Sequence, residues 1–186
     1  MVEAATYSAA ETLRDGRRVD IRALRQDDRS EILAAVGRTS PESLYRRFFT
    51  VKRGFTKEET AYFLNIDFVD HVALVAVVEE ASRPVIVGGA RYILLRPGKA
   101  EVAFAVIDQY QGQGIGAALL RHLAGIARDA GLRELIADVL PGNDAMLKVF
   151  AKSGLPLRTK HESDVMHVVL QLDATRRPPP SPPSDP

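Results

Sequence analysis

Cysteine is absent from this sequence of 186 residues. Disulfides, thiolate zinc sites and a cysteine nucleophile are therefore excluded, so any acyl transfer must be direct or use another nucleophile. An excess of one charge is also absent, because 25 Lys and Arg residues balance 24 Asp and Glu residues to a net charge of +1. This balance gives no sign of a surface for nucleic acid or membrane.

Long apolar runs are missing as well. No stretch approaches the roughly 20 apolar residues of a transmembrane helix, and the N-terminus, with Glu3 and no basic apolar segment, does not have the pattern of a signal peptide. We therefore predict a cytoplasmic protein whose partners include neither nucleic acid nor a membrane. The chain has four histidines, and three of them, His71, His161 and His167, show no metal-ligand spacing. Because cysteine is also absent, we predict no metal site.

The most informative stretch is residues 101–131, which reads EVAFAVIDQYQGQGIGAALLRHLAGIARDAG. Its first residues alternate, with Val102, Phe104 and Val106 on one face, and predict a strand that ends near Ile107. Apolar residues at helical spacing follow from residue 115, and a glycine at position 131 suits a left-handed helix cap. His122 falls on the packing face of this helix, so we expect it in the core rather than in a catalytic site.

Between the strand and the helix lie three glycines in five residues, within QGQGIG at 111–116. A strand that leads through a glycine loop into a helix can bind an anion, because the first helical N–H groups lack partners and glycine lets a phosphate approach the main chain. The loop matches neither the Gly-Lys-Ser/Thr ending of a P-loop nor the dinucleotide Gly-x-Gly-x-x-Gly. The alternative is a tight turn whose glycines serve only packing.

The rest of the chain predicts one α+β domain over residues 18–173. We expect helices at 27–36, 42–49 and 57–65, the last two beginning at the caps Ser40 and Thr56, and strands at 18–24, 71–79, 85–94, 134–140 and 165–172. Gly88-Gly89 suggests a bulge, and a further helix should run from Asn143 to Gly154. Residues 1–17 read as a loose leader and the proline-rich residues 174–186 as a disordered tail.

The loop sequence Gln-x-x-Gly-x-Gly resembles the pyrophosphate-binding signature of the GNAT (GCN5-related) N-acetyltransferases, whose cofactor is acetyl-CoA. Four segments are similar to the GNAT domain of bacterial protein-lysine acetyltransferases that modify acyl-CoA synthetases: SPESLYRRFF (40–49), HVALVAVVE (71–79), AEVAFAVIDQYQGQGIG (100–116) and VLPGNDAMLKVFAKSGL (139–155). The resemblance extends from about Val19 to Leu172. It implies the GNAT fold, a single three-layer domain with a central, mostly antiparallel mixed sheet flanked by helices.

The resemblance also implies which residues bind acetyl-CoA. The pyrophosphate would lie on the loop and the helix start, at Gln111, Gly112, Gln113, Gly114, Ile115, Gly116 and Ala117. The main chain of Phe104, Ala105 and Val106 would pair with the pantetheine arm and present an N–H to the thioester oxygen, an oxyanion-type role. Asn143 would lie near the pantetheine, although as a sequence feature it is first a helix cap.

Two acids are candidates for the base that deprotonates the attacking amine. Glu101 corresponds to the glutamate that similar lysine acetyltransferases use, through water; the alternative is a strand-edge glutamate in solvent. Asp138, where many GNAT enzymes carry a glutamate, is the reserve and could instead orient water. Many family members have a tyrosine where this chain has Phe150, so the leaving thiolate would take its proton from solvent.

We therefore predict an acetyl-CoA-dependent N-acetyltransferase that acts by direct attack in a ternary complex, with a protein lysine, such as one on an acyl-CoA synthetase, as acceptor. Arg46, Arg47 and Arg53 would suit an acidic protein surface, or form a solvated helix face. A small-molecule amine acetyltransferase is the alternative enzyme, although no cluster of fixed charge for a small substrate is evident. A non-catalytic acyl-CoA-sensing module is the alternative from another class.

Overall fold

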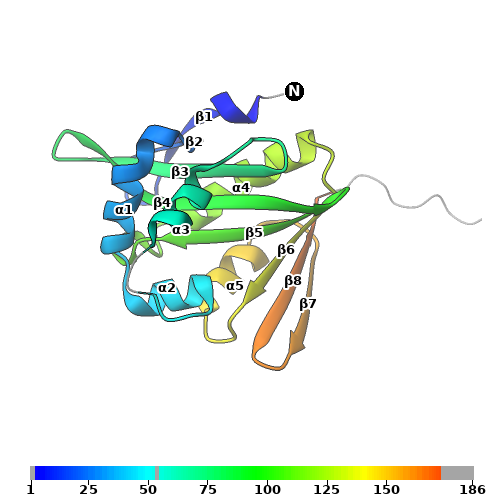
Figure 1. The fold of residues 1–186 in the computed structure, drawn as a ribbon. Coiled ribbons are helices and arrows are strands. Elements are labelled where there is room, and N and C mark those ends of the chain that lie inside the picture. The colour runs from blue at the N-terminus through cyan, green and yellow to red at the C-terminus, as the bar shows by residue number, and fades with distance from the viewer. Residues whose placement is uncertain (1–2, 53–54, 173–186) are drawn as a thin grey trace, which may run out of the picture.

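The computed structural model describes residues 3–52 and 55–172, and the predicted tail at 174–186 lies outside this part of the chain (Figure 1). Eight strands of the described chain form one sheet in the order β1-β2-β3-β4-β5-β6-β8-β7. Neighbouring strands are antiparallel except β5 and β6, so the sheet is mixed, as predicted. The strands are β1 (Ser8–Thr12), β2 (Arg18–Ala23), β3 (His71–Glu80), β4 (Arg83–Arg96), β5 (Lys99–Val106), β6 (Glu134–Val139), β7 (Leu157–Glu162) and β8 (Val165–Gln171).

Helices cover both faces of the sheet and give the predicted three layers (Figure 1). The helices are α1 (Arg29–Gly37), α2 (Pro41–Phe48), α3 (Lys57–Leu64), α4 (Ile115–Asp129) and α5 (Asp144–Ala151), with short 3-10 turns η1 (Ala4–Thr6), η2 (Gln26–Asp28) and η3 (Asp108–Tyr110). The starts of two helices follow the sequence: the side chain of Ser40 accepts from Ser43 N–H at 3.2 Å, and Thr56 accepts from Glu59 N–H at 3.1 Å in a complete capping box.

Strand β3 is apolar at nearly every position because both of its faces are covered. Its alternate residues Val72 and Leu74 belong to the core that packs on α4 and α5, whereas Ala73 and Val75 belong to the core beneath α1 and α3. The helices α1 and α3 therefore lie on one face and α4 and α5 on the other. No helix within residues 3–52 and 55–172 has the length and apolar character needed to cross a membrane.

The loose leader predicted for residues 1–17 is wrong for the described part of that segment. Ser8–Thr12 form β1, which pairs with β2 as an antiparallel edge strand. Tyr7 O–H and Glu11 Oε1 both bond the ring of His122 on α4, the latter at 2.7 Å. The small and polar residues of β1 bury little apolar surface, so the sequence offered no strong strand pattern.

Two further features of the sheet differ from the sequence prediction. Strand β7 was not predicted, since five of its six residues are exposed and no apolar alternation marks it. The predicted bulge is present but falls one residue before the glycine pair, at Val87, because Ala76 pairs with Gly88 and Val77 with Ile86. A β-carbon on Gly88 would lie 3.0 Å from the Ala105 carbonyl oxygen, so glycine permits the close approach of β4 and β5.

Candidate active site

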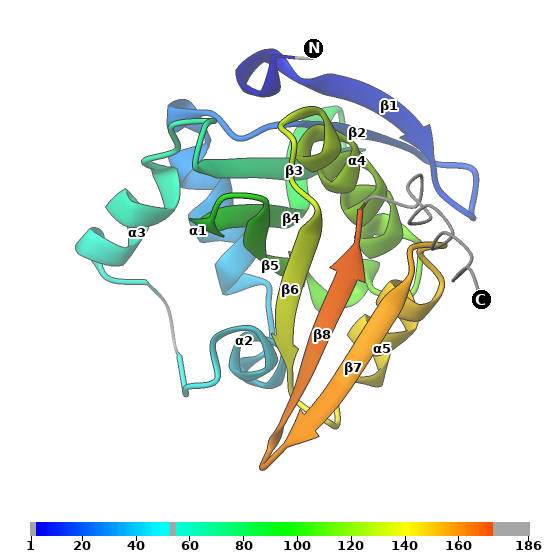
Figure 2. The same cartoon turned by 90° about the vertical axis from the view of Figure 1, so that its right-hand side faces the viewer.

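The parallel strands β5 and β6 are paired at one end only. Their register joins Lys99–Glu101 to Glu134–Ile136, and from Val102 onward β5 has no pairing with β6. Figure 1 shows the two strands diverging, and Figure 2 shows β6, β8 and β7 running at a steep angle to β2–β5. The divergence leaves the second half of β5 with an open main-chain edge.

Hydrogen bonds near the end of β5 show which main-chain groups face this edge. Ile107 N–H donates to the carbonyl of Val87 on β4 at 3.0 Å. The Val106 carbonyl points to the opposite edge of β5, where it accepts from the Gln111 side chain at 3.0 Å. Because the main-chain groups of a strand alternate, those of Phe104 and Val106 face the open edge. The main chain of Ala105 turns toward β4, so the predicted pairing of Ala105 with a pantetheine arm does not fit this register.

The glycine-rich loop brings unpartnered N–H groups to the same edge. Gly112 and Gly114 have φ of +76° and +101°, a region that side chains rarely adopt. The first hydrogen bond of α4 runs from Ala118 N–H to Gly114 O at 3.0 Å, so the N–H groups at 115–117 precede the helical ladder. A β-carbon on either glycine would meet no described atom within 4 Å, and an anion therefore has space beside the main chain.

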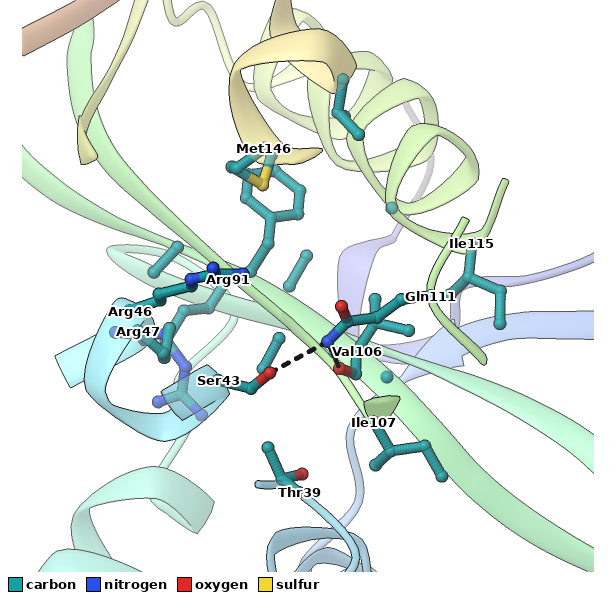
Figure 3. Close-up of a pocket in the computed structure, with 18 of the residues that line it drawn as sticks. Thr39, Ser43, Arg46, Arg47, Arg91, Val106, Ile107, Gln111, Ile115 and Met146 are labelled. Atoms are coloured by element: carbon teal, nitrogen blue, oxygen red, sulfur yellow. Dashed lines mark hydrogen bonds between the residues drawn. The ribbon is translucent and has the colours of Figure 1, made fainter. Parts of the chain in front are cut away.

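Side chains hold this loop against the start of α2. Gln111 Nε2 donates to Ser43 Oγ at 3.1 Å as well as to Val106 O (Figure 3). The Asp108 carboxylate accepts from the Ser40 N–H at 2.7 Å, from Ser40 Oγ at 2.8 Å and from Ser43 Oγ at 2.7 Å. Burial opposes the charge on Asp108, but these hydrogen bonds outweigh it and lower the pKa of the carboxyl group. Gln111 is thus placed to shape the loop.

One pocket of about 840 Å³ joins the open edge, the loop and the acids. Its lining includes every predicted site residue except Gln113: Glu101, Phe104, Ala105, Val106, Gln111, Gly112, Gly114, Ile115, Gly116, Ala117, Asp138 and Asn143. Gln113 lies outside the lining, where its side chain bonds the Gln109 carbonyl at 2.9 Å and Arg17 at 2.6 Å. The structure thus brings all but one of the predicted site residues to the walls of one pocket.

The two candidate acids differ in how they are held. Glu101 is paired in register with Ile136 of β6, so Asp138, two residues further along β6, lies on the same face of the sheet. Asp138 Oδ1 lies 2.6 Å from His167 Nδ1 on β8, so one oxygen of that carboxylate is engaged. Within residues 3–52 and 55–172, the exposed Glu101 carboxylate makes no hydrogen bond or ion pair. Of the two acids, Glu101 is therefore the one with both carboxylate oxygens available to accept a hydrogen bond.

Two arginines on the Glu101 face extend the pocket, and the sequence interpretation missed their role. Arg91 of β4 pairs with Ala103, so its side chain shares the face of Glu101, and Arg47 reaches the same pocket from α2 (Figure 3). The expectation that no cluster of fixed charge faces the pocket is therefore wrong. Arg46 differs, because it forms an ion pair with Glu42 at 2.6 Å.

Two pocket residues at α5, Asn143 and Phe150, have structural roles. Asn143 Oδ1 accepts from Met146 N–H at 3.3 Å and caps α5, in agreement with the simpler sequence interpretation. Phe150, at the position where many relatives carry tyrosine, is buried, and its ring packs edge-on against Phe104 with centroids 5.8 Å apart. Among residues 3–52 and 55–172, no group of three potential metal ligands is clustered.

A free strand edge beside a glycine loop at a helix start is suited to binding an extended carrier molecule that bears a phosphate group. The chain belongs to the acetyltransferase (GNAT) family, whose model matches residues 39–155. Members of this family are N-acetyltransferases that use acetyl-CoA.

Two curated relatives are similar over much of this domain. Acetyltransferase PA5475 of Pseudomonas aeruginosa is 35% identical over 137 residues, which cover 73% of this chain and 74% of that protein. Acetyltransferase Pat of Mycolicibacterium smegmatis is 38% identical over 119 residues, which cover 62% of this chain but only 34% of that protein. The chain thus spans about a third of Pat.

Solved structures give the same assignment. The GNAT domain of S. lividans PAT superimposes with a TM-score of 0.80 at 33% identity, covering 88% of this chain and 96% of that domain. A cAMP-binding acyltransferase from Mycobacterium smegmatis superimposes with a TM-score of 0.61 at 27% identity, covering 91% of this chain and 48% of that one. This chain therefore covers nearly all of the first structure and about half of the second.

Proposed function

We propose that this protein binds acetyl-CoA along the open edge of β5 and transfers the acetyl group to the lysine side chain of a substrate protein in a ternary complex. The observation that carries the proposal is the meeting of three features in one pocket: a free strand edge, the unpartnered N–H groups at 115–117 and the uncommitted carboxylate of Glu101. We also propose a cytoplasmic location for it.

The residues present fit acetyl-CoA, because open space borders the main chain of Gly112 and Gly114. The N–H groups of Ile115, Gly116 and Ala117 would bind the pyrophosphate, where the helix dipole adds positive potential. The main chain of Phe104 and Val106 would bind the pantetheine arm as an added strand does. The bound cofactor supplies an activated acetyl thioester, which an N–H at this edge would polarise.

Glu101 is the proposed general base. A lysine ammonium with an ordinary pKa near ~10.4 is almost fully protonated at neutral pH and cannot attack until it loses a proton. Glu101 has free acceptor sites toward the pocket, directly or through water, whereas Asp138 is held by His167. Since Phe150 has no hydroxyl group, the departing thiolate would be protonated by solvent.

A protein lysine, on an acyl-CoA synthetase, is the acceptor that the sequence resemblance implies. A second candidate, acetylation of a small amine that carries an anion, is favoured by one observation. Arg47 and Arg91 place two positive charges in the pocket, as a small charged substrate would require.

The test is incubation of the enzyme with labelled acetyl-CoA and, separately, candidate acyl-CoA synthetases and a panel of free amines. We expect label on a synthetase lysine above the non-enzymatic background, with release of free CoA. Efficient acetylation of a free amine with no protein labelled would instead establish the small-amine function. Binding of acetyl-CoA without release of CoA in any reaction would indicate an acyl-CoA-sensing module.

A further inference from the structure

Arg47 and Arg91 differ in charge balance from Arg22, which is also half-buried. Arg22, whose side chain is 17% exposed, donates two hydrogen bonds of 2.7 Å to the Asp28 carboxylate. Within residues 3–52 and 55–172, Arg47 and Arg91 have no carboxylate oxygen within 4.0 Å. Because burying a charge is costly unless it is paired, the missing partner needs an explanation.

The contacts of Arg91 are neutral and fix its orientation. Its guanidinium lies 4.3 Å from the centroid of the Phe63 ring on α3, and it donates to Phe63 O at 3.4 Å. Its Nη1 lies 3.1 Å from Nε2 of His71. Burial, aided by the charge of Arg91, lowers the pKa of His71, so the ring is neutral at pH 7 and Nε2 accepts the hydrogen bond. These contacts preorganise the guanidinium without neutralising it.

The two arginines also repel each other. Burial first, and the charge of Arg47 second, lower the pKa of Arg91 to about 9, and burial lowers the pKa of Arg47 to about 10, opposed by the charge of Glu101. Both side chains still carry their charge at pH 7. An incoming anion would therefore gain from both half-buried guanidiniums.

We propose that Arg47 and Arg91 form a carboxylate-binding subsite of the acceptor, so that the enzyme prefers amines that carry a carboxylate beside the reacting nitrogen. This subsite rests on the proposed acetyltransferase function and specifies which acceptors the enzyme prefers. A carboxylate suits this pair, because a planar guanidinium pairs with a carboxylate through two parallel hydrogen bonds.

Two sources could supply such a carboxylate: an acidic side chain next to the target lysine of a protein, or a free amino acid. The small side chains of Ala103 and Ala105 share the face of Glu101 and Arg91 and leave room between base and subsite. An acceptor would thus be held at its carboxylate by the arginines and at its amine by Glu101.

The test uses matched ligand pairs that differ only in the carboxylate. One pair consists of acetylated, amidated Glu-Lys and Gln-Lys dipeptides, and the other of free amino acids and their carboxamides. Calorimetric titration measures binding without acetyl transfer, and steady-state kinetics with acetyl-CoA measures KM and kcat. The enzymes are the wild type, Arg91→Met, Arg91→Lys and the control Arg96→Met, which removes an equal charge from an exposed position on the same strand.

We expect the wild type and Arg96→Met to bind the carboxylate member of one pair about 10- to 100-fold more tightly than its amide. Arg91→Met should abolish this preference and raise KM for the carboxylate ligand, and Arg91→Lys should restore only part of it. Arg91→Met should also keep or raise the melting temperature, because it removes a half-buried charge that no carboxylate in the described part of the chain pairs. A purely structural arginine would lower it.

The ligand pair that shows a carboxylate preference identifies the kind of acceptor. A preference for Glu-Lys over Gln-Lys indicates a protein acceptor, and a preference for free amino acids over their carboxamides indicates a small acceptor. Equal binding within both pairs, undetectable binding of every carboxylate ligand, or an equal loss for both members in Arg91→Met would overturn the subsite. A carboxylate preference in calorimetry without acetylation of any amine would keep the subsite and reject the proposed transferase function instead.

Discussion

The start of α4 offers a substitution, Gly116→Glu, that separates cofactor binding from folding. Gly112 and Gly114 need positive φ, so any side chain there would strain the loop. Gly116 has no such requirement, and its β-carbon would meet Val149 Cγ2 at 3.5 Å, an ordinary contact. A glutamate in the first helical turn also stabilises the helix by about 0.3–1 kcal/mol.

The size of the effect follows from the position of the N–H groups. Acetyl-CoA at ~100 times its dissociation constant should stabilise the wild type by about 2.7 kcal/mol, or roughly 5–11 °C in melting temperature for a domain of this size. A carboxylate ~4 Å from a phosphate charge costs about 4 kcal/mol at an effective dielectric constant of ~20, which weakens binding roughly 10³-fold. The variant should therefore show no shift at the same cofactor concentration.

The assay is a thermal melt with and without acetyl-CoA, compared with Gly125→Glu as the control. Gly125 lies in the middle of the same helix, where a β-carbon would meet no described atom within 4 Å, so the control adds the same charge away from the loop. We expect a wild-type shift for the control and, for unliganded Gly116→Glu, a melting temperature equal to or slightly above that of the wild type. An equal cofactor shift in both variants would refute the pyrophosphate site.

Three more outcomes test the chemistry and the fold. Glu101→Gln should lower turnover by roughly 10² to 10⁴ at neutral pH while acetyl-CoA still binds, and a larger loss in Asp138→Asn would reverse the two roles. Asp28→Asn should lower the free energy of unfolding by about 3 kcal/mol at pH 7. Burial opposes the charge on Asp28, but pairing with Arg22 outweighs it and lowers the pKa of the carboxyl group. The pair therefore stabilises the fold above the unfolded pKa of about 4. In urea titrations, the difference in unfolding free energy between Asp28→Asn and the wild type should shrink as the pH falls below that value. Deleting residues 1–12, which removes β1, should lower the melting temperature by roughly 4–10 °C, whereas a loose leader would change nothing.

The elements of the fold that were predicted correctly are recognisable from sequence patterns only a few residues long. The caps at Ser40 and Thr56 are local hydrogen bonds between a side chain and a main-chain group three residues ahead. The doubly buried strand β3 is marked by its apolar run. The missed strands β1 and β7 lie at the two edges of the sheet, where exposed polar residues remove the alternation on which strand prediction depends.

The predicted site residues that line one pocket mostly follow one another along the chain. The loop and the open strand are contiguous, so a short sequence motif is enough to group them. Arg91 gave no signal, because it becomes part of the pocket only through its pairing with Ala103 and its contact with Phe63, residues distant from it along the chain. The contact of Asp108 with Ser43, 65 residues away, was invisible for the same reason.

The register of β5 explains how one strand can serve both substrates. Its even-numbered side chains, such as Val102 and Phe104, pack with α4 and α5, while its odd-numbered positions place Glu101 and two alanines beside Arg91. The main-chain edge, at right angles to both faces, is left open by the departure of β6. A slip of one residue would bury the glutamate against α4 and fill the acceptor space with valine and phenylalanine. The pairing of β4 with β5, tightened at Gly88, is therefore what keeps base, cofactor edge and arginine pair in one pocket.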